Sequence, residues 1–147
     1  MKRFLVCPLL LLKAAMEKPG TILIADPDAQ FLSHWSRTLG EEGFQIFTAA
    51  RSTQAIQIVQ QEKVDLLIMA AEMPEMKAYE AISILKGVDP SLLIIVTARE
   101  NTPELEARIR QNPIYYYHVK TFGPEELLLA VRNAWERLAA GGNRKLD

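Results

Sequence analysis

Short apolar runs alternate with amphipathic segments along the chain from residue 21 onward. Apolar runs that contain few charges are typical of strands buried on both faces of a sheet. Such runs predict strands at 21–25, 44–48, 65–69, 92–96 and 114–119. The segments between the strands repeat their apolar residues at helical spacing. They predict a first helix that contains Leu32, Trp35 and Leu39 and runs up to Gly40 and Gly43, and further helices from Ser52, near 78–86, near 103–111 and from Pro124.

The last predicted helix has one apolar side and one polar side. Its core side carries Leu127, Leu128, Val131, Ala134, Trp135 and Leu138. Leu129 falls on the opposite side, together with the polar residues Arg132, Asn133 and Glu136. At the start of the second helix, Ser52 is the expected N-cap, and Ala55, Ile56 and Val59 form the inner face. Three tyrosines at 115–117 alternate faces on an expected edge strand, which predicts that at least one is exposed.

Five strands that are each followed by a helix specify an α/β fold with a parallel sheet. Right-handed crossovers and helices on both faces favour the flavodoxin-like, doubly wound strand order 2-1-3-4-5. We therefore expect one domain over residues 20–140 and a short tail at 141–147.

The first 19 residues differ from this pattern. A basic start, Met1-Lys2-Arg3, precedes the apolar run 4–12, which imitates a signal peptide but is much shorter than the ~20 residues of a membrane span. We interpret the segment as an extension, or as a start placed too early with Met16 as the true one. Membrane association is the less favoured alternative.

Charge and cysteine content narrow the classes of partner and compartment. The 147 residues carry a formal net charge of −1, and Lys and Arg are scattered, so the sequence shows no signature of nucleic-acid binding. A single cysteine, Cys7, excludes an internal disulfide framework and favours a reducing, cytoplasmic compartment.

Polar residues gather where the predicted strands end. In doubly wound sheets, functional sites form at the carboxyl ends of the strands. The residues at those ends are Asp26, Pro27 and Asp28 after the first strand, Ala70, Ala71 and Glu72 after the third, Thr97 and Ala98 after the fourth, and Lys120 after the fifth.

Five motifs in this order resemble the receiver domains of bacterial two-component response regulators. They are Ile22-Leu23-Ile24-Ala25-Asp26, Met69-Ala70 with Met73-Pro74, Ile94-Ile95-Val96-Thr97-Ala98, Tyr117-His118-Val119-Lys120, and Phe122-Gly123-Pro124-Glu125-Glu126-Leu127. The resemblance covers about residues 20–139. It implies that Thr97 matches the hydroxyl position of the family and Tyr117 its aromatic switch position. Lys120 then matches the lysine that lies three residues after that aromatic residue in the family.

Two departures from the family pattern bear on chemistry. The resemblance puts Ala70 at the position of the phospho-accepting aspartate, and a methyl group cannot attack phosphorus. Pro27 stands where the family has an acidic metal ligand, so we expect neither bound Mg²⁺, nor another metal or cofactor, nor catalysis. Asp26, Asp28 and Glu72 are then a remnant acidic pocket, with Lys120 expected to form an ion pair with Asp26 and Thr97 to satisfy loop amides.

One further departure concerns the backbone after the lysine. Thr121 replaces the family's proline, so a trans Lys120–Thr121 bond is expected.

Three classes of function remain at this stage. The favoured one is a pseudo-receiver that signals by protein–protein interaction without phosphorylation, through the face formed by residues 103–111, 114–119 and the last helix, with a homodimer as one form. Tyr116 and Leu129 are its candidate anchors. The alternatives are a phospho-acceptor that uses Glu72 or Asp28, and a small-molecule binder in the same crevice; the absence of a glycine-rich loop after the first strand disfavours a flavin.

Overall fold

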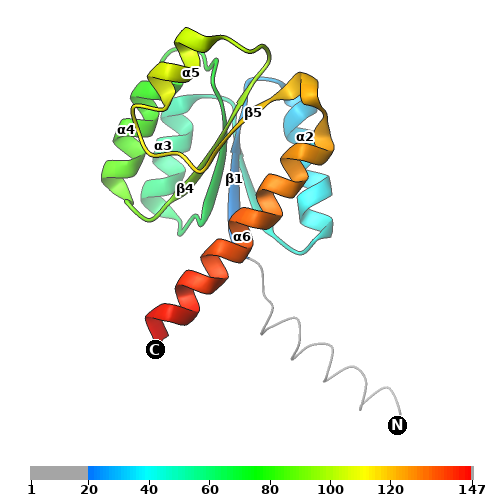
Figure 1. The fold of residues 1–147 in the computed structure, drawn as a ribbon, viewed down its shortest axis with the longest axis vertical. Coiled ribbons are helices and arrows are strands. Elements are labelled where there is room, and N and C mark those ends of the chain that lie inside the picture. Colours follow the sequence, from blue (N-terminus) through cyan, green and yellow to red (C-terminus); the bar gives the residue numbers. More distant parts are fainter. Residues whose placement is uncertain (1–19, 147) are drawn as a thin grey trace.

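A five-stranded parallel sheet forms the centre of the molecule (Figure 1). The computed structural model describes the backbone of residues 20–146 and the side chains of residues 20–141. The strands are β1 (Thr21–Ala25), β2 (Gln45–Ala49), β3 (Leu66–Ala70), β4 (Leu93–Ala98) and β5 (Tyr116–Val119). They lie in the order β2-β1-β3-β4-β5, which confirms the predicted flavodoxin-like topology.

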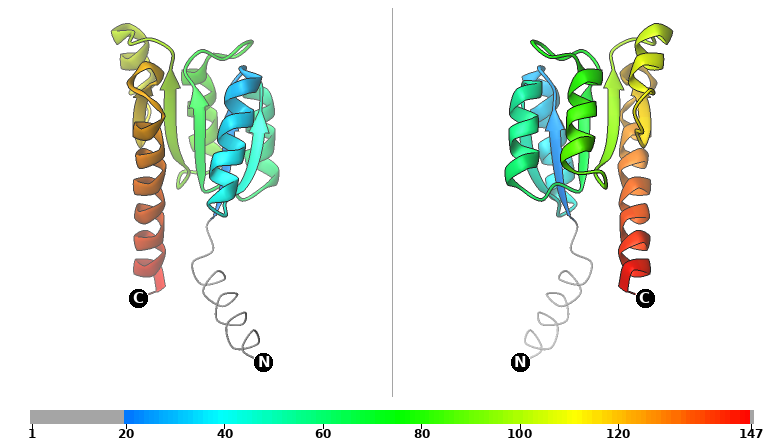
Figure 2. Two further views of the ribbon diagram at one scale, coloured as in Figure 1. Left: turned by 90° about the vertical axis from the view of Figure 1, so that its right-hand side faces the viewer. Right: turned by 90° about the vertical axis from the view of Figure 1, so that its left-hand side faces the viewer.

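Helices cover both faces of the sheet (Figures 1 and 2). They are α2 (Ala29–Glu41), α3 (Ser52–Gln61), α4 (Ala78–Val88), α5 (Pro103–Ile109) and α6 (Pro124–Leu146), with a short 3-10 helix, η1 (Lys120–Phe122), before α6. α2 and α6 pack on one face, and α3, α4 and α5 pack on the other. α6 continues beyond the end of the sheet.

Alternation along the strands divides the apolar residues between two cores. In β1, Leu23 and Ala25 pack toward α3 and α4, whereas Ile22 and Ile24 pack toward α2 and α6. Successive side chains of a strand point to opposite faces, so a continuous apolar run supplies both cores. The continuity of the apolar runs in the sequence is therefore explained by the helices on both sides.

Several predicted boundaries move by one or more residues. β2 and β3 lie one residue later than expected, β4 runs over 93–98, and β5 begins at Tyr116 rather than at residue 114. α5 ends at Ile109, two residues earlier than expected. α6 continues to Leu146, so the expected domain boundary at residue 140 falls inside this helix. The predictions for residues 1–19 lie outside the described part of the chain.

Ser52 is not the N-cap of α3, contrary to the prediction. Arg51 occupies the cap position, and Ser52 is the first residue of the helix. The Ser52 hydroxyl is buried and donates a hydrogen bond to the carbonyl oxygen of Met76 at 2.9 Å. This tertiary bond ties α3 to the loop after β3 and replaces the local capping bond.

The three tyrosines are also less exposed than predicted. β5 is an edge strand, yet Tyr117 is buried and Tyr115 and Tyr116 are half-buried. α6 covers one side of the edge: the Tyr116 hydroxyl donates to Glu126, and the Arg137 guanidinium lies 5.7 Å from the ring centre of Tyr115. Leu129, by contrast, is 57% exposed, as its helical position predicts.

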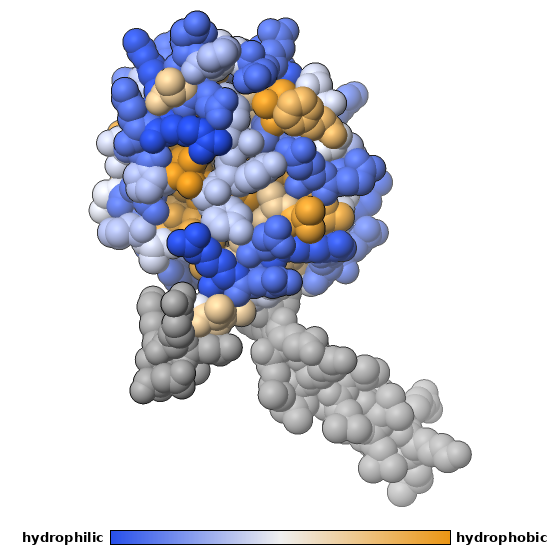
Figure 3. Space-filling view, viewed as in Figure 1, coloured by the Kyte–Doolittle hydropathy of each residue, from blue (hydrophilic) through white to orange (hydrophobic). Residues whose placement is uncertain are grey.

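The face drawn in Figure 3 is mostly polar, with small separate apolar patches. Four large hydrophobic side chains are exposed within the described residues, namely Ile84, Val88, Phe122 and Leu129. Across residues 20–146, the helices lack a stretch both long enough and apolar enough to span a bilayer.

Candidate functional site

The polar residues at the carboxyl ends of the strands surround one cleft of about 420 Å³. Its lining consists of Asp26, Pro27, Asp28, Ala70, Glu72, Thr97, Arg99 and Lys120. Parallel strands bring these residues together because their carboxyl ends share one edge of the sheet. In the β3–β4 register, Ala70 lies directly opposite Thr97. The structure therefore brings most of the predicted edge residues together, whereas Ala71, Ala98 and Tyr117 do not line the cleft.

Asp26 and Lys120 form the ion pair that the sequence predicts. Lys120 Nζ lies 2.8 Å from Asp26 Oδ2, and the Asp26 carboxylate is buried. The other oxygen, Asp26 Oδ1, accepts a 2.8 Å hydrogen bond from the Asp28 amide. Lys120 Nζ also lies 4.0 Å from the ring centre of Phe31, so a cation–π contact fixes the lysine from a second side.

Ala70 and Thr97 form the inner part of the cleft. Both are buried, and the Thr97 hydroxyl has no hydrogen-bond partner among the described residues. The prediction that this hydroxyl accepts hydrogen bonds from loop amides is therefore wrong. The Ala71 amide, in the loop after β3, donates instead to the backbone carbonyl of Thr97 at 2.6 Å.

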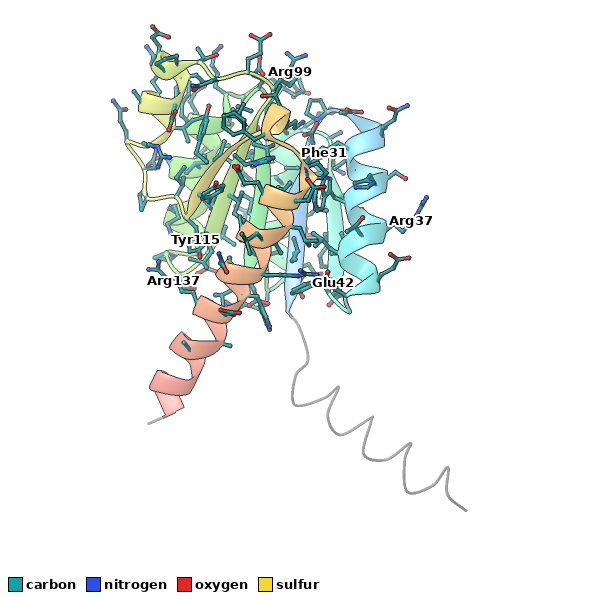
Figure 4. The ribbon with its side chains drawn as sticks, turned by 45° about the vertical axis from the view of Figure 1, so that its right-hand side comes forward. Phe31, Arg37, Glu42, Arg99, Tyr115 and Arg137 are labelled. Atoms are coloured by element: carbon teal, nitrogen blue, oxygen red, sulfur yellow. The ribbon has the colours of Figure 1, made fainter. Side chains whose placement is uncertain are left out.

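A second ion pair lies at the rim of the cleft. Arg99 Nε and Nη2 donate to the two carboxylate oxygens of Glu72 at 3.2 and 3.1 Å. These hydrogen bonds lower the pKa of the Glu72 carboxyl, partly against the effect of burial, and the same bonds raise the pKa of Arg99. Figure 4 shows Arg99 and Phe31 near the same end of the sheet. Neither residue is among the sequence-predicted site residues, although Arg99 directly follows a strand end.

Two carboxylates of the cleft, those of Asp26 and Asp28, already accept hydrogen bonds. Mg²⁺ prefers several oxygen ligands in octahedral geometry. Asp26 already accepts from Lys120 and Asp28, and Asp28 Oδ1 accepts a 2.9 Å bond from the Gln30 amide as the N-cap of α2. Pro27, between them, supplies no carboxylate. In residues 20–141, no group of three or more His, Cys, Asp or Glu side chains is arranged to hold a metal ion.

The aromatic residues of β5 lie in two different environments. Tyr117 faces the α3–α4–α5 core; its hydroxyl lacks a partner in the described part of the chain, and burial, above all, raises its pKa. Tyr116 faces α6 and donates to Glu126 Oε1 at 2.8 Å, which raises the pKa of Tyr116 and lowers that of Glu126. His118, which the sequence predictions do not include, is buried with Nδ1 3.2 Å from the same oxygen.

Both candidate interaction anchors line one depression on the α6 side of β5. Its volume is about 280 Å³, and its lining is Tyr115, Tyr116, Glu126, Leu129, Ala130 and Asn133. Tyr116 and Leu129, predicted from separate elements, therefore share one surface.

The backbone after β5 positions Lys120. The described residues contain no cis peptide bond, so the Lys120–Thr121 bond is trans, as expected. Gly123 donates its amide to the Lys120 carbonyl at 3.1 Å and adopts φ 105°. This positive φ favours glycine and lets the chain turn from η1 into α6.

The family model of the response regulator receiver domain matches residues 22–132, which include four strands entirely and all of β1 except Thr21. The chain belongs to the receiver domain family.

Similar receiver domains occur in curated proteins. The transcriptional regulatory protein GlrR of Escherichia coli is 28% identical over 123 residues, which cover 83% of this chain and 28% of that protein. The sporulation initiation phosphotransferase F of Bacillus subtilis is 25% identical over 111 residues, which cover 76% of this chain and 90% of that protein. The chain thus spans about a quarter of the length of GlrR and most of the length of the phosphotransferase.

Solved structures support the receiver fold. The signal receiver domain of an HD domain-containing protein from Pseudomonas fluorescens Pf-5 is 29% identical, with a TM-score of 0.78 over 86% of this chain and 94% of that chain. A CheY-like receiver from Methanospirillum hungatei, at 20% identity, has a TM-score of 0.79 over 84% of this chain and 98% of that one.

Proposed function

We propose that this receiver domain signals by contact with a protein partner and does not take up a phosphoryl group. The observation that carries this proposal is Ala70 at the end of β3, opposite Thr97 and in the same cleft as Lys120. Covalent phosphotransfer requires a nucleophile, and the alanine methyl group has none. The Lys120 ammonium, for its part, is paired with Asp26.

The other carboxylates in the cleft are poorly suited to replace that nucleophile. Glu72 is held by two hydrogen bonds from Arg99 at the rim. Asp28 caps α2 through the Gln30 amide. Because neither carboxylate projects from the end of β3 beside Thr97, a phospho-acceptor role for Glu72 or Asp28 is the less favoured alternative.

Intact mass after incubation with acetyl phosphate and Mg²⁺ tests this part of the proposal. We expect no stoichiometric adduct on the natural chain or on Ala70→Asp, since the single change restores the nucleophile but not the acidic residue at position 27. The double variant Pro27→Asp/Ala70→Asp is the positive control and is expected to gain an acid-stable, hydroxylamine-sensitive phosphoryl group. A stoichiometric adduct on the natural chain would contradict the proposal.

For partner contact, we propose the surface formed by α5, β5 and α6. Support comes from the shared depression lined by Tyr116 and Leu129, whose charged and polar border includes Glu126 and Asn133. An apolar anchor surrounded by polar groups is the common arrangement of a small protein interface. The beryllofluoride-activated NtrC4 receiver, a structural neighbour at 22% identity, is a dimer, and a second copy of this chain is accordingly the first partner to test.

Substitution of the two anchors tests this surface. Leu129→Ala and Tyr116→Ala should each weaken self-association or partner binding by on the order of thirtyfold, about 2 kcal/mol, if they are anchors. Ile84→Ala on α4 is the matched control, because Ile84 is also an exposed aliphatic side chain. Circular dichroism checks folding, and analytical ultracentrifugation measures association. If both anchor variants associate as tightly as the natural chain and Ile84→Ala, the surface is assigned incorrectly.

A further inference from the structure

One oxygen of Glu126 joins a buried histidine to the depression between β5 and α6. His118 is 2% exposed, and its Nδ1 lies 3.2 Å from Glu126 Oε1. The same oxygen accepts the hydrogen bond of the Tyr116 hydroxyl at 2.8 Å. Glu126 and Tyr116 line the depression, whereas His118 does not. A change in the charge of His118 can therefore reach the surface through a single shared acceptor.

The chemistry of this contact determines which nitrogen of His118 can take up a proton. The hydrogen bond from Tyr116, followed by that from His118, lowers the pKa of the Glu126 carboxyl against the opposing effect of desolvation. The ionised carboxylate only accepts hydrogen bonds, so Nδ1 of the neutral imidazole carries the hydrogen and donates it. Nε2 enters no hydrogen bond among the described residues and is the atom that gains a further proton.

The groups around His118 leave Glu126 as its acidic partner within the described residues. From β4, Thr97 lies opposite His118 in the register, and its hydroxyl does not titrate. Along the chain, Tyr116 has a raised pKa and stays neutral, and the Lys120 ammonium is held in its own ion pair. From α6, the carboxylate of Glu126 faces the ring and offsets the cost of a buried positive charge there.

We propose that protonation of His118 draws the Glu126 carboxylate onto the imidazolium and releases the Tyr116 hydroxyl. Nε2 takes the proton from solvent, and the Nδ1–H bond to Oε1 then joins two charged groups, which makes it shorter and stronger. Because both donors share one oxygen, the stronger bond to His118 weakens the bond from Tyr116. The switch itself is intramolecular; its use in regulating partner contact rests on the proposed function.

NMR titration of the full chain between pH 5 and pH 8 tests the switch, because histidines change charge in this range. The signals to follow are the ring protons of His118, the ring carbon of Tyr116 that bears the hydroxyl, and the amide of Glu126. We expect all three to change with one midpoint. A Tyr116 signal that stays constant while His118 titrates would overturn the proposal, and so would a His118 ring that keeps one charge throughout.

His34 supplies the matched control, because it is the only other histidine of the chain and is exposed on α2. His34→Asn should leave the titration of Tyr116 unchanged, whereas His118→Asn should remove it. Glu126→Gln keeps an oxygen for Tyr116 but removes the negative charge, so the response should disappear there too. Glu126 is at the surface, and this variant decides the question even where His118→Asn folds poorly. An unchanged Tyr116 response in Glu126→Gln would overturn the proposal.

Self-association at pH 5.5 and pH 7.5 tests the link to the partner surface. A tyrosine that is already held in one orientation binds without the ordering cost of a free one, roughly threefold to tenfold in affinity. Association should be weaker by this factor at pH 5.5 in the natural chain, and independent of pH in Glu126→Gln. Equal affinity of the natural chain at both pH values would overturn the regulatory role. Where the anchor variants show that the surface is assigned incorrectly, the NMR titration alone decides the switch.

Discussion

At the residue scale, Tyr116 and Tyr117 carry the same hydroxyl group into different environments. Tyr116 donates to Glu126, whereas the buried Tyr117 hydroxyl has no partner within residues 20–141. A buried unpaired hydroxyl costs about 1–3 kcal/mol, and a typical hydrogen bond contributes about 1 kcal/mol. We predict that Tyr117→Phe leaves the free energy of unfolding unchanged or raises it by about 1 kcal/mol, and that Tyr116→Phe lowers it by about 1 kcal/mol.

Urea unfolding of the two variants measures this difference, with the natural chain as reference. The two substitutions remove the same atom from adjacent residues, so each variant controls for the other. Should Tyr117→Phe be the more destabilising of the two, the Tyr117 hydroxyl must have a hydrogen-bond partner in solution.

The Glu72–Arg99 pair links stability to pH. Arg99 lowers the pKa of the Glu72 carboxyl, so the pair contributes stability above the ordinary glutamate pKa of about 4.3 and loses it as the pH falls through the lowered value. The side chains of Glu72 and Arg99 are 46% and 74% exposed, so solvent screening keeps the contribution of this pair to stability small. Glu72→Gln should therefore lower the free energy of unfolding slightly at pH 7, and this effect should diminish as the pH falls below the ordinary glutamate range.

Denaturant titrations at pH 7 and pH 3 test this prediction. Glu136→Gln serves as the control, because Glu136 is exposed on α6 and forms no ion pair with the described residues. An equal effect of Glu72→Gln at both pH values is incompatible with a carboxylate–guanidinium origin.

The residues of the cleft differ in how far sequence alone predicts them. Asp26 and Lys120 were predictable as a pair because both follow strands whose carboxyl ends share one edge, and the ion pair is present. The contacts of Arg99 with Glu72 and of Phe31 with Lys120 depend on the paths of side chains across loops, which no local pattern encodes. Thr97 illustrates the same limit, since its position was predicted but its lack of a partner was not.

At the element scale, the pattern predicted every described strand and each of the long helices but not all of their ends. Periodicity identifies an element from many residues, whereas a terminus depends on one or two hydrogen bonds. Ser52 shows this dependence, because its hydroxyl bonds to Met76, 24 residues away, instead of capping α3. β5 likewise begins later than the apolar run predicts. The Tyr115 amide donates to the Ile94 carbonyl, but the paired register between β4 and β5 begins only at Tyr116.

Two glycines in different backbone conformations lead to opposite predictions. Gly123 adopts φ 105°, and a Cβ there would lie 3.1 Å from Glu125 Oε2, so Gly123→Ala should lower the free energy of unfolding by at least about 1 kcal/mol. Gly87 lies within α4 with nothing within 4 Å of an added Cβ, so Gly87→Ala should raise it by about 0.5–1 kcal/mol. Thermal and urea unfolding of both variants measure the changes, and a stabilising Gly123→Ala would contradict the strained turn before α6.

At the scale of the whole molecule, the sequence predicts the strand order and the burial of both faces of the sheet correctly. An unbroken apolar run can be buried only if helices cover both faces, and right-handed crossovers leave few possible orders. The length of α6 did not follow, because the helix extends past the sheet, where no core contact constrains the pattern (Figure 2). Tyr116 and Leu129 line one depression because helical and strand periodicity each fix the direction of a side chain, and their role as anchors stays a prediction.

The last prediction concerns the contribution of residues 1–15 to the stability of the domain. β1 begins at Thr21, and both described hydrophobic clusters are built from residues between 22 and 134. Gly20 packs closely against Asp65 and the Trp135 ring, and the Thr21 amide donates to Asp65 at 2.9 Å, so the contacts of the β1 start are present from residue 20 onward.

A chain that starts at Met16 should therefore match the full chain in thermal midpoint to within about 4 °C, the shift that about 1 kcal/mol produces in a domain of this size. Scanning calorimetry of the two chains, with Gly20→Ala in each as a control that disturbs the start of β1, makes the measurement. A much larger loss in the shorter chain would show that the apolar run at 4–12 packs on the domain and contributes to its core.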